Sequence, residues 1–175
     1  DEVKAGAESY EAFITEELIP VIEEGFRIKE GPENTALMGS SMGGLVTFNI
    51  GIRRPDIFGK LAVMSPSFWW GKSSPIQKLN SYDYSNLKTK IWLDTGDSEG
   101  KFMSFSDAVI DKFVEIKSNK DIDLIYYLAP GAVHNELDWG ERVHCPLLYF
   151  FGNIGEKKKI ELHGKKQIRV NERKA

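Results

Sequence analysis

The stretch Gly39-Ser40-Ser41-Met42-Gly43-Gly44 is the most informative part of this 175-residue chain. It fits the pattern G-x-S-x-G, with an apolar run at 36–38 before it and a helix-compatible segment at 45–54 after it. A serine at a sharp strand-to-helix turn is lifted out of the sheet, so its hydroxyl can meet a substrate. The glycines suit such a turn because it is strained and a neighbouring segment leaves no room for Cβ atoms. We therefore interpret Ser41 as a candidate nucleophile, with a purely structural turn as the alternative.

The residue after this serine, Met42, would begin the helix. Its backbone N–H would then face a developing oxyanion, where the helix dipole also favours negative charge. The glycine loop lacks the G-x-G-x-x-G spacing of a dinucleotide site and the G-K-[ST] ending of a phosphate-binding loop. The histidines and the cysteine are scattered, without metal-ligand spacing. The sequence therefore predicts an oxyanion-binding N–H at Met42, no metal and no cofactor.

The overall charge and hydrophobicity limit the kinds of partner. The net charge is −3 at pH 7, which argues against a nucleic-acid surface. No apolar run approaches the length of a membrane span. Hydrophobic residues make up 41% of the chain, which is ordinary for a globular domain with its own core. We therefore expect neither nucleic acid nor membrane as a partner.

Strand-like and helix-like segments alternate along most of the chain. Short apolar runs, the first of them expected to be a buried strand, predict strands over residues 35–39, 60–65, 90–95 and 122–128. Apolar residues at helical spacing predict helices over residues 9–26, 42–52, 105–117 and 135–151. Such alternation predicts an α/β fold, a parallel sheet flanked by helices. Catalytic groups in such a sheet lie at the carboxyl ends of the strands.

The pattern changes near Gly155. Residues 160–162 and 168–170 alternate apolar with polar side chains around a polar turn, which is typical of a hairpin. We therefore divide the chain into the C-terminal part of an α/β-hydrolase domain over residues 1–154 and, over 155–175, a β-like tail or the start of a following domain. An appended β domain is more common in secreted modular enzymes, so the tail slightly favours an extracellular protein.

A serine hydroxyl is a weak nucleophile until a base removes its proton, and histidine is the usual base. The chain has three histidines. His134 follows the fourth predicted strand, at its carboxyl end, after the flexible segment 130–133. His144 lies inside the last predicted helix and His163 in the turn of the tail, where a surface or packed imidazole is the simpler interpretation. We therefore predict His134 as the base.

Three carboxylates lie at or just beyond the end of the third predicted strand: those of Asp94, Asp97 and Glu99. An acid is needed there to hold the histidine tautomer and to stabilise its charged form. Asp94 is nearest the strand and could cap the turn, Asp97 could form an Asx turn, and Glu99 has the longest reach toward His134. The spacing favours Glu99, and it leaves Asp97, Asp94 and a serine–histidine pair without an acid as alternatives.

An aromatic pair, Trp69 and Trp70, follows the second predicted strand. Near the mouth of a site these rings could form an apolar wall of a substrate pocket for an acyl or aromatic group. The alternative is that they pack their loop onto the core. Trp139 and Arg142 follow His134 at helical spacing, and we expect them to hold the histidine loop rather than to touch a substrate.

Together these residues resemble the esterase D family of α/β hydrolases, over about residues 6–152. The order serine, acid, histidine is that of an α/β hydrolase. The stretches that carry the resemblance are Gly39-Ser40-Ser41-Met42-Gly43-Gly44, Leu93-Asp94-Thr95-Gly96-Asp97-Ser98-Glu99-Gly100, Gly131-Ala132-Val133-His134-Asn135-Glu136 and Tyr10-Glu11-Ala12-Phe13-Ile14-Thr15-Glu16-Glu17-Leu18-Ile19-Pro20. The resemblance implies Ser41 as nucleophile, His134 as base and Glu99 as acid. The family includes feruloyl and acetyl-xylan esterases, siderophore-lactone esterases, S-formylglutathione hydrolases and mycolyl transferases.

One departure from the family pattern concerns the sheet. The family fold begins with several strands before the helix predicted at 9–26, and they are not in this chain. They would include the loop that usually supplies a second oxyanion N–H, and without them the nucleophile strand lacks a neighbour. An exposed apolar strand edge invites pairing. We therefore expect a companion N-terminal chain, or self-association through the exposed edge of the sheet.

These features predict a serine carboxylic-ester hydrolase that works through an acyl-enzyme. Its substrate would be a small-molecule or polysaccharide-linked ester. Acyl transfer to a sugar hydroxyl would use the same three residues, and a catalytically inert binding or scaffold fragment is the third interpretation. The acyl pocket is built from loops, so the sequence does not name the ester.

Overall fold

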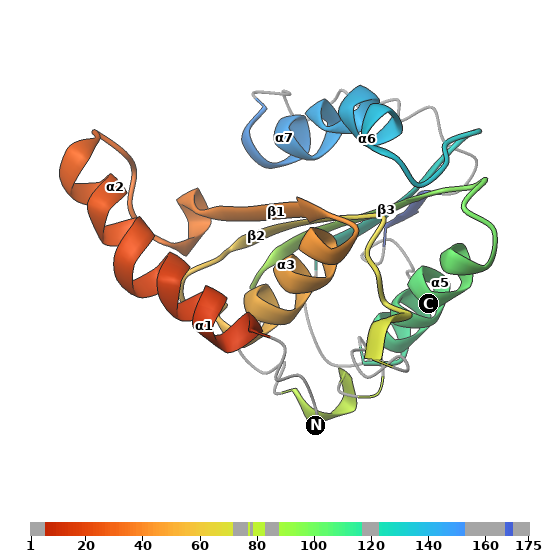
Figure 1. Cartoon of the computed structure of the whole chain (residues 1–175), viewed down its shortest axis with the longest axis horizontal. Coiled ribbons are helices and arrows are strands. Elements are labelled where there is room, and N and C mark those ends of the chain that lie inside the picture. Colours follow the sequence, from red (N-terminus) through yellow and green to blue (C-terminus); the bar gives the residue numbers. More distant parts are fainter. Residues whose placement is uncertain are drawn as a thin grey trace.

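Five strands form one sheet in the computed structural model, which describes residues 6–71, 77, 79–82, 88–116, 123–152 and 167–169. In chain order and in sheet order the strands are β1 (Ala36–Ser40), β2 (Lys60–Met64), β3 (Lys90–Gly96), β4 (Asp123–Ala129) and β5 (Gln167–Arg169). Strands β1 to β4 pair in parallel, and β5 pairs antiparallel with β4. The predicted α/β class, a parallel sheet flanked by helices, is confirmed (Figure 1).

Parallel strands need crossover connections, and a helix supplies the one between β1 and β2 and the one between β3 and β4. The helices α3 (Met42–Arg53) and α5 (Lys101–Ile116) cover one face of the sheet, and α6 (Glu136–Arg142) and α7 (His144–Phe151) cover the other (Figure 1). The register pairs Ser40 with Met64 and Met64 with Asp94. The loops that follow β1, β2 and β3 therefore emerge at the same end of the sheet.

Each face of the sheet has its own apolar core because the central strands are covered on both sides. In β3, Ile91 and Leu93 belong to the core under α3 and α5, and Trp92 between them belongs to the core under α7. This is the alternation that a strand imposes on its side chains. In the first core, the ring of Phe48 meets that of Phe113 edge-on, with the ring centroids 6.0 Å apart.

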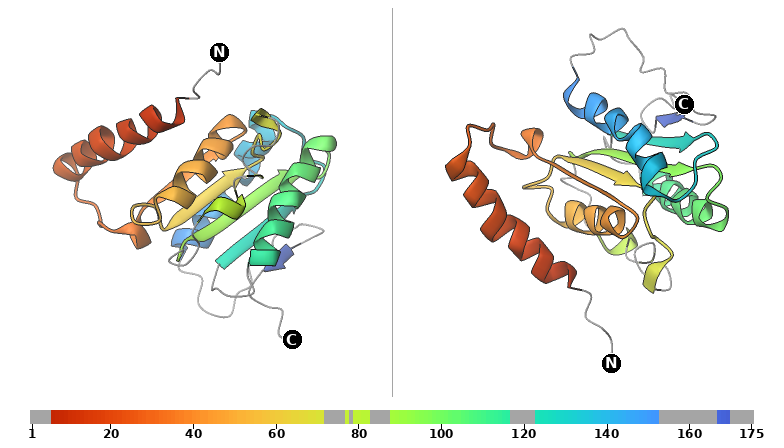
Figure 2. Two further views of the ribbon diagram at one scale, coloured as in Figure 1. Left: turned by 90° about the horizontal axis from the view of Figure 1, so that it is seen from below. Right: turned by 45° about the horizontal axis from the view of Figure 1, so that its top comes forward.

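The helix predicted at 9–26 is present as a rod of three segments, which Figure 2 shows beside the sheet: α1 (Ala7–Ala12), the π-helical η1 (Phe13–Leu18) and α2 (Ile19–Gly25). Pro20 lies in the first turn of α2. Of the apolar residues that predicted this helix, only Ile14 is buried. The others are exposed: Tyr10, Phe13, Leu18, Val21 and Ile22. The apolar stripe is therefore largely uncovered by the part of the chain that the structure describes.

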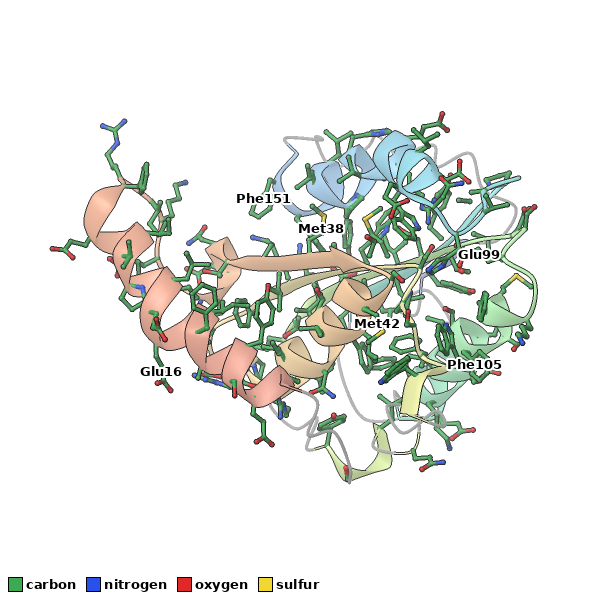
Figure 3. The ribbon with its side chains drawn as sticks, in the orientation of Figure 1. Glu16, Met38, Met42, Glu99, Phe105 and Phe151 are labelled. Carbon is green, nitrogen blue, oxygen red and sulfur yellow. The ribbon has the colours of Figure 1, made fainter. Side chains whose placement is uncertain are left out.

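The prediction that the first strand is buried is wrong. Each residue of β1 is exposed or half-buried, and Met38 is 40% exposed. Among the described strands β1 pairs with β2 alone, so one of its edges is open. The side chain of Met38 lies on the face of the sheet that α7 covers (Figure 3). Apolar composition predicted a covered strand, but burial depends on a neighbour that composition does not report.

Two predicted helices differ in extent. The helix predicted at 105–117 begins earlier, at Lys101 in α5. The helix predicted at 135–151 is two helices, which are separated at Val143. Pro146 lies in the first turn of α7, where a missing N–H removes no helical hydrogen bond.

The tail is only partly described. Strand β5 is one of its two predicted strands, placed one residue earlier than predicted. Residues 153–166, and with them the other predicted strand, its turn and His163, lie outside the described residues, so the boundary near Gly155 stays a prediction. Within the described residues, every helix is too short or too polar to span a membrane. Two short 3-10 segments, η2 (Pro32–Asn34) and η3 (Leu79–Ser81), lie before β1 and between β2 and β3.

Candidate active site

Ser41 stands at the sharp turn between β1 and α3. Its backbone has φ 55° and ψ −119°, a conformation that costs a non-glycine residue energy and is held by its surroundings. The backbone N–H of Ser41 donates to Met64 O at 3.0 Å, which ties the turn to the end of β2. A Cβ on Gly39 would lie 2.6 Å from the carbonyl carbon of Gly43, and one on Gly44 would lie 2.8 Å from Met64 O. The glycines are therefore required by close approach of the backbone.

His134 lies opposite this serine, with its Nε2 2.9 Å from Ser41 Oγ. It belongs to the loop between β4 and α6. Asn135 caps α6 by accepting from the Asp138 N–H at 2.9 Å, and Asp138 accepts in return from the Val133 N–H. These two hydrogen bonds hold the residues on both sides of His134.

Glu99 completes a line of three side chains. Its Oε2 is 2.9 Å from His134 Nδ1, and its side chain is 1% exposed, against 27% for the histidine. A carboxylate only accepts hydrogen bonds, so the shared proton belongs to Nδ1, and in the neutral ring Nε2 accepts from the serine hydroxyl. Glu99 and Met42, labelled in Figure 3, both lie toward the end of the sheet where the strands terminate.

The two aspartates that competed with Glu99 in the sequence have other partners. Asp97 Oδ1 accepts from the Gly131 N–H at 2.7 Å and so closes the turn before the histidine loop. Asp94 is fully buried and accepts from Trp92 Nε1 at 2.7 Å and from Arg142 Nε at 3.0 Å. Burial raises the pKa of Asp94, and the Arg142 guanidinium opposes that rise. Of the three carboxylates, the structure brings that of Glu99 to His134.

Two serines that the sequence analysis did not single out join this site. Ser65 Oγ donates to Glu99 Oε1, and Ser67 Oγ lies 3.2 Å from Ser41 Oγ. Both follow β2 at its carboxyl end. The rule that located the acid and the histidine, polar residues at strand ends, also applies to them, but a lone serine after a strand carries no pattern of its own.

The family model described as "Putative esterase" matches residues 2–141. The chain belongs to this esterase family. It is 27% identical over 133 residues to the uncharacterized protein YbbA of Bacillus subtilis, covering 72% of this chain and 52% of YbbA. It is 29% identical over 136 residues to an endo-1,4-beta-xylanase/feruloyl esterase of Xylanibacter ruminicola, covering 78% of this chain and 17% of that protein.

Among solved structures, the enterobactin esterase of Shigella flexneri shares the fold of this esterase-family chain. The TM-score is 0.72 at 21% sequence identity, over 82% of this chain and 38% of the other. The chain thus spans about half the length of YbbA and smaller shares of the other two proteins.

Aromatic rings flank the histidine of the esterase-family chain. Phe102 lies 6.0 Å from the His134 ring and Trp69 lies 5.5 Å from Phe102, all between centroids. Trp139 meets the His134 ring edge-on at 4.9 Å. Trp69 and Trp70 are 37% and 52% exposed. The predicted pocket residues Trp69 and Trp70 thus form an exposed aromatic ledge that reaches the site through Phe102.

A separate pocket of about 320 Å³ lies between the end of β1 and α6. Its lining does not include Trp69 or Trp70; it consists of Met38, Gly39, Ser40, Met64, Glu136, Trp139, Gly140 and Val143. The pocket adjoins the open edge of β1.

His144 is exposed at the start of α7, with its Nε2 3.5 Å from Cys145 Sγ, and is not part of the serine site. Within the described residues no group of three or more His, Cys, Asp and Glu side chains is arranged to hold a metal.

Proposed function

We propose that this chain carries the nucleophile, base and orienting acid of a carboxylic-ester hydrolase: Ser41, His134 and Glu99. The observation that carries the proposal is the pair of 2.9 Å contacts that join Ser41 Oγ to Nε2, and Nδ1 to Glu99 Oε2, of a single imidazole. Membership of the esterase family supports it. Acyl transfer by a serine requires this arrangement: a hydroxyl beside a base, and an acid that orients the base from its other side.

In the first half-reaction, Ser41 Oγ attacks the ester carbonyl carbon while His134 Nε2 takes the hydroxyl proton. The oxyanion of the tetrahedral intermediate accepts from the Met42 N–H, which stands in the first turn of α3, where backbone N–H groups have no helical partner. His134 then passes its proton to the leaving alcohol, and the acyl group stays on Ser41. Glu99 stabilises the imidazolium throughout.

In the second half-reaction, water attacks the acyl-enzyme. His134 takes a proton from the water, the bond between Ser41 Oγ and the acyl carbon breaks, and the proton returns to Oγ as the acid leaves. The test is turnover of a short-chain nitrophenyl ester, with fluorophosphonate labelling of Ser41. Loss of both in Ser41→Ala supports the proposal, and unchanged turnover in Ser41→Ala contradicts it. An added alcohol acceptor separates hydrolysis from acyl transfer, because transfer would yield a new ester.

We also propose that the acyl group of the substrate is aromatic. The aromatic ledge supports this, because its Trp69 contacts Phe102 and Phe102 contacts His134. Offset and edge-on ring contacts favour an aromatic acyl group beside such rings. One relative is named a feruloyl esterase. The expected result for Trp69→Ala is a higher KM for a feruloyl ester and an unchanged KM for an acetyl ester. An equal rise for both esters would contradict an aromatic preference.

A further proposal concerns the open edge of β1. We propose that a strand from the part of the family fold that this chain does not span pairs with this edge. Unpaired strand N–H and C=O groups invite pairing, and the exposed Met38 beside the edge supports a covered state. That strand would bring a second oxyanion N–H close to Ser41. Without it, two copies of the chain would pair through the same edge.

A further inference from the structure

A buried polar cluster lies directly behind Glu99. Its members are Ser65, Asp94 and Arg142, which are 1%, 0% and 5% exposed. Charged groups this deep are costly unless each is paired and hydrogen-bonded. They come from the end of β2, from β3 and from α6 and meet behind the acid. The proposed reaction steps use none of these three residues, so their burial in one cluster behind Glu99 needs another explanation.

The hydrogen bonds of this cluster lead from Arg142 through the Ser65 hydroxyl to Glu99. Arg142 donates from Nε to Asp94 Oδ1 at 3.0 Å, from Nη1 to Asp138 O at 2.9 Å and from Nη2 to Ser65 Oγ at 2.7 Å. A guanidinium only donates, so the Ser65 hydroxyl must accept from it. The single proton of that hydroxyl then goes to Glu99 Oε1.

The two oxygens of Glu99 are therefore not equivalent. Oε1 accepts from the Ser65 hydroxyl and from the Gly96 N–H at 2.7 Å, and Arg142 Nη2 lies 3.9 Å away. Oε2 faces His134 Nδ1. With one oxygen held by two donors and a positive charge, the carboxylate cannot rotate to offer its other edge to the histidine.

The backbone of Ser65 adds an independent observation. Its φ is 38°, in the left-handed region that favours glycine, and its N–H donates to Asp94 O at 2.9 Å. Glycine would adopt this conformation at no steric cost. A serine at such a position indicates that the hydroxyl has a use that outweighs the strain.

Building on the proposed ester hydrolysis, we infer that Ser65 and Arg142 are positioning residues for the reaction. They hold Glu99 so that a single carboxylate oxygen faces His134 and the histidine proton stays on Nδ1. Asp94 anchors Arg142, and Trp92 anchors Asp94. Neither Ser65 nor Arg142 takes or gives a proton in the reaction.

The role of Ser65 is tested with two variants, both of which remove its hydroxyl group. Ser65→Ala and Ser65→Gly both lack the hydroxyl, but only glycine relieves the positive φ. Each should lower kcat by about tenfold to a hundredfold, the rate equivalent of one hydrogen bond to a charged group, and leave KM unchanged. Ser65→Gly should nevertheless melt at a higher temperature than Ser65→Ala. A kcat that follows melting temperature instead of the hydroxyl would overturn the inference. The buried Ser106→Ala is the control and should keep the wild-type kcat.

The arginine is tested by separating charge burial from positioning. Arg142→Met leaves Asp94 buried without its counter-ion and should lower both stability and kcat. The double variant Asp94→Asn/Arg142→Met removes both charges and should recover stability. Its kcat should stay low, because Ser65 still lacks the Arg142 donor and Glu99 still lacks the positive charge 3.9 Å from its Oε1. Recovery of kcat together with stability would overturn the inference. Arg54→Met breaks the exposed pair with Asp56 and is the control.

Ser41→Ala separates this inference from the proposed function. If Ser41→Ala abolishes turnover while the Ser65 and Arg142 variants keep the wild-type kcat, the positioning role is wrong and the proposed hydrolysis stands. If Ser41→Ala keeps turnover, the proposed function fails and the positioning role fails with it.

Discussion

Gly96 lies against the backbone of Ala132. A Cβ on Gly96 would come within 2.1 Å of Ala132 O, the carbonyl that also accepts from the Ser98 N–H at 3.1 Å. The loop that carries Glu99 and the loop that carries His134 are therefore in direct backbone contact. The distance between the acid and the histidine depends on this contact as well as on the two side chains.

We expect Gly96→Ala to separate the two loops. The added methyl group would collide with the backbone of Ala132 and crowd the Glu99 carboxylate. The variant should therefore lose about 1–3 kcal/mol of stability, as overpacked sites do. Ester turnover should fall as the acid moves away from the histidine. Thermal unfolding and nitrophenyl ester kinetics measure the two effects. Gly25→Ala is the matched control, because a Cβ there meets nothing within 4 Å. A fully active Gly96→Ala would show that the loops tolerate separation.

The acids Glu99 and Asp97 should respond differently to amide substitution. Glu99→Gln can present an N–H to Nδ1 and favour the wrong tautomer, so kcat should fall by about a thousandfold or more. Asp97→Asn keeps an oxygen that can accept from the Gly131 N–H, so its loss should stay below about tenfold. The measurement is kcat at saturating nitrophenyl ester. Similar losses in both variants would mean that geometry does not single out Glu99.

Two substitutions of Trp139 distinguish the contribution of its ring packing to stability from that of its indole N–H. Its buried Nε1 has no hydrogen-bond partner within the described part of the chain, so Trp139→Phe should leave stability unchanged or raise it slightly. Trp139→Ala also removes the edge-on contact with the His134 ring, and we expect a loss of about 3–5 kcal/mol at most, together with lower turnover. Melting curves of the two variants check this. A strongly destabilised Trp139→Phe would indicate a partner for the indole N–H.

The open edge of β1 should make the chain self-associate. Sedimentation at rising protein concentration should show growing species, and Met38→Lys should reduce them, because a charged side chain on an edge strand opposes pairing. Leu137→Lys is the control, since Leu137 is 81% exposed on α6 and does not line the pocket beside β1. A wild-type chain that stays monomeric at every concentration would contradict the need for a partner at this edge.

Local patterns were sufficient for most of the fold. Strand and helix periods in the core are set by which side chains must face inward, so alternation along the chain predicted a parallel sheet with helices on both faces. The main exception is β1, whose apolar residues predicted burial although the strand lies at an edge. Burial of a strand depends on a neighbouring strand, and the spacing of apolar residues within the strand does not show whether that neighbour is present.

The candidate site divides in the same way. The glycine turn and the strand-end rule pointed to Ser41 and His134, which lie 93 positions apart in the chain and 2.9 Å apart in space. The acid stayed open between Glu99, Asp97 and Asp94. The structure distinguishes them by their partners, because Gly131 engages Asp97 and Arg142 engages Asp94.

The amino-acid sequence by itself determined the layered α/β architecture and the strained serine turn, since both follow from side-chain periodicity and from the backbone freedom of glycine. Only the tertiary structure decided which carboxylate meets the imidazole and that Ser65 and Arg142 stand behind it. Those contacts join residues from different strands and helices, and hydrogen bonds of about 3 Å are set by how the elements pack, which spacing along the chain does not encode.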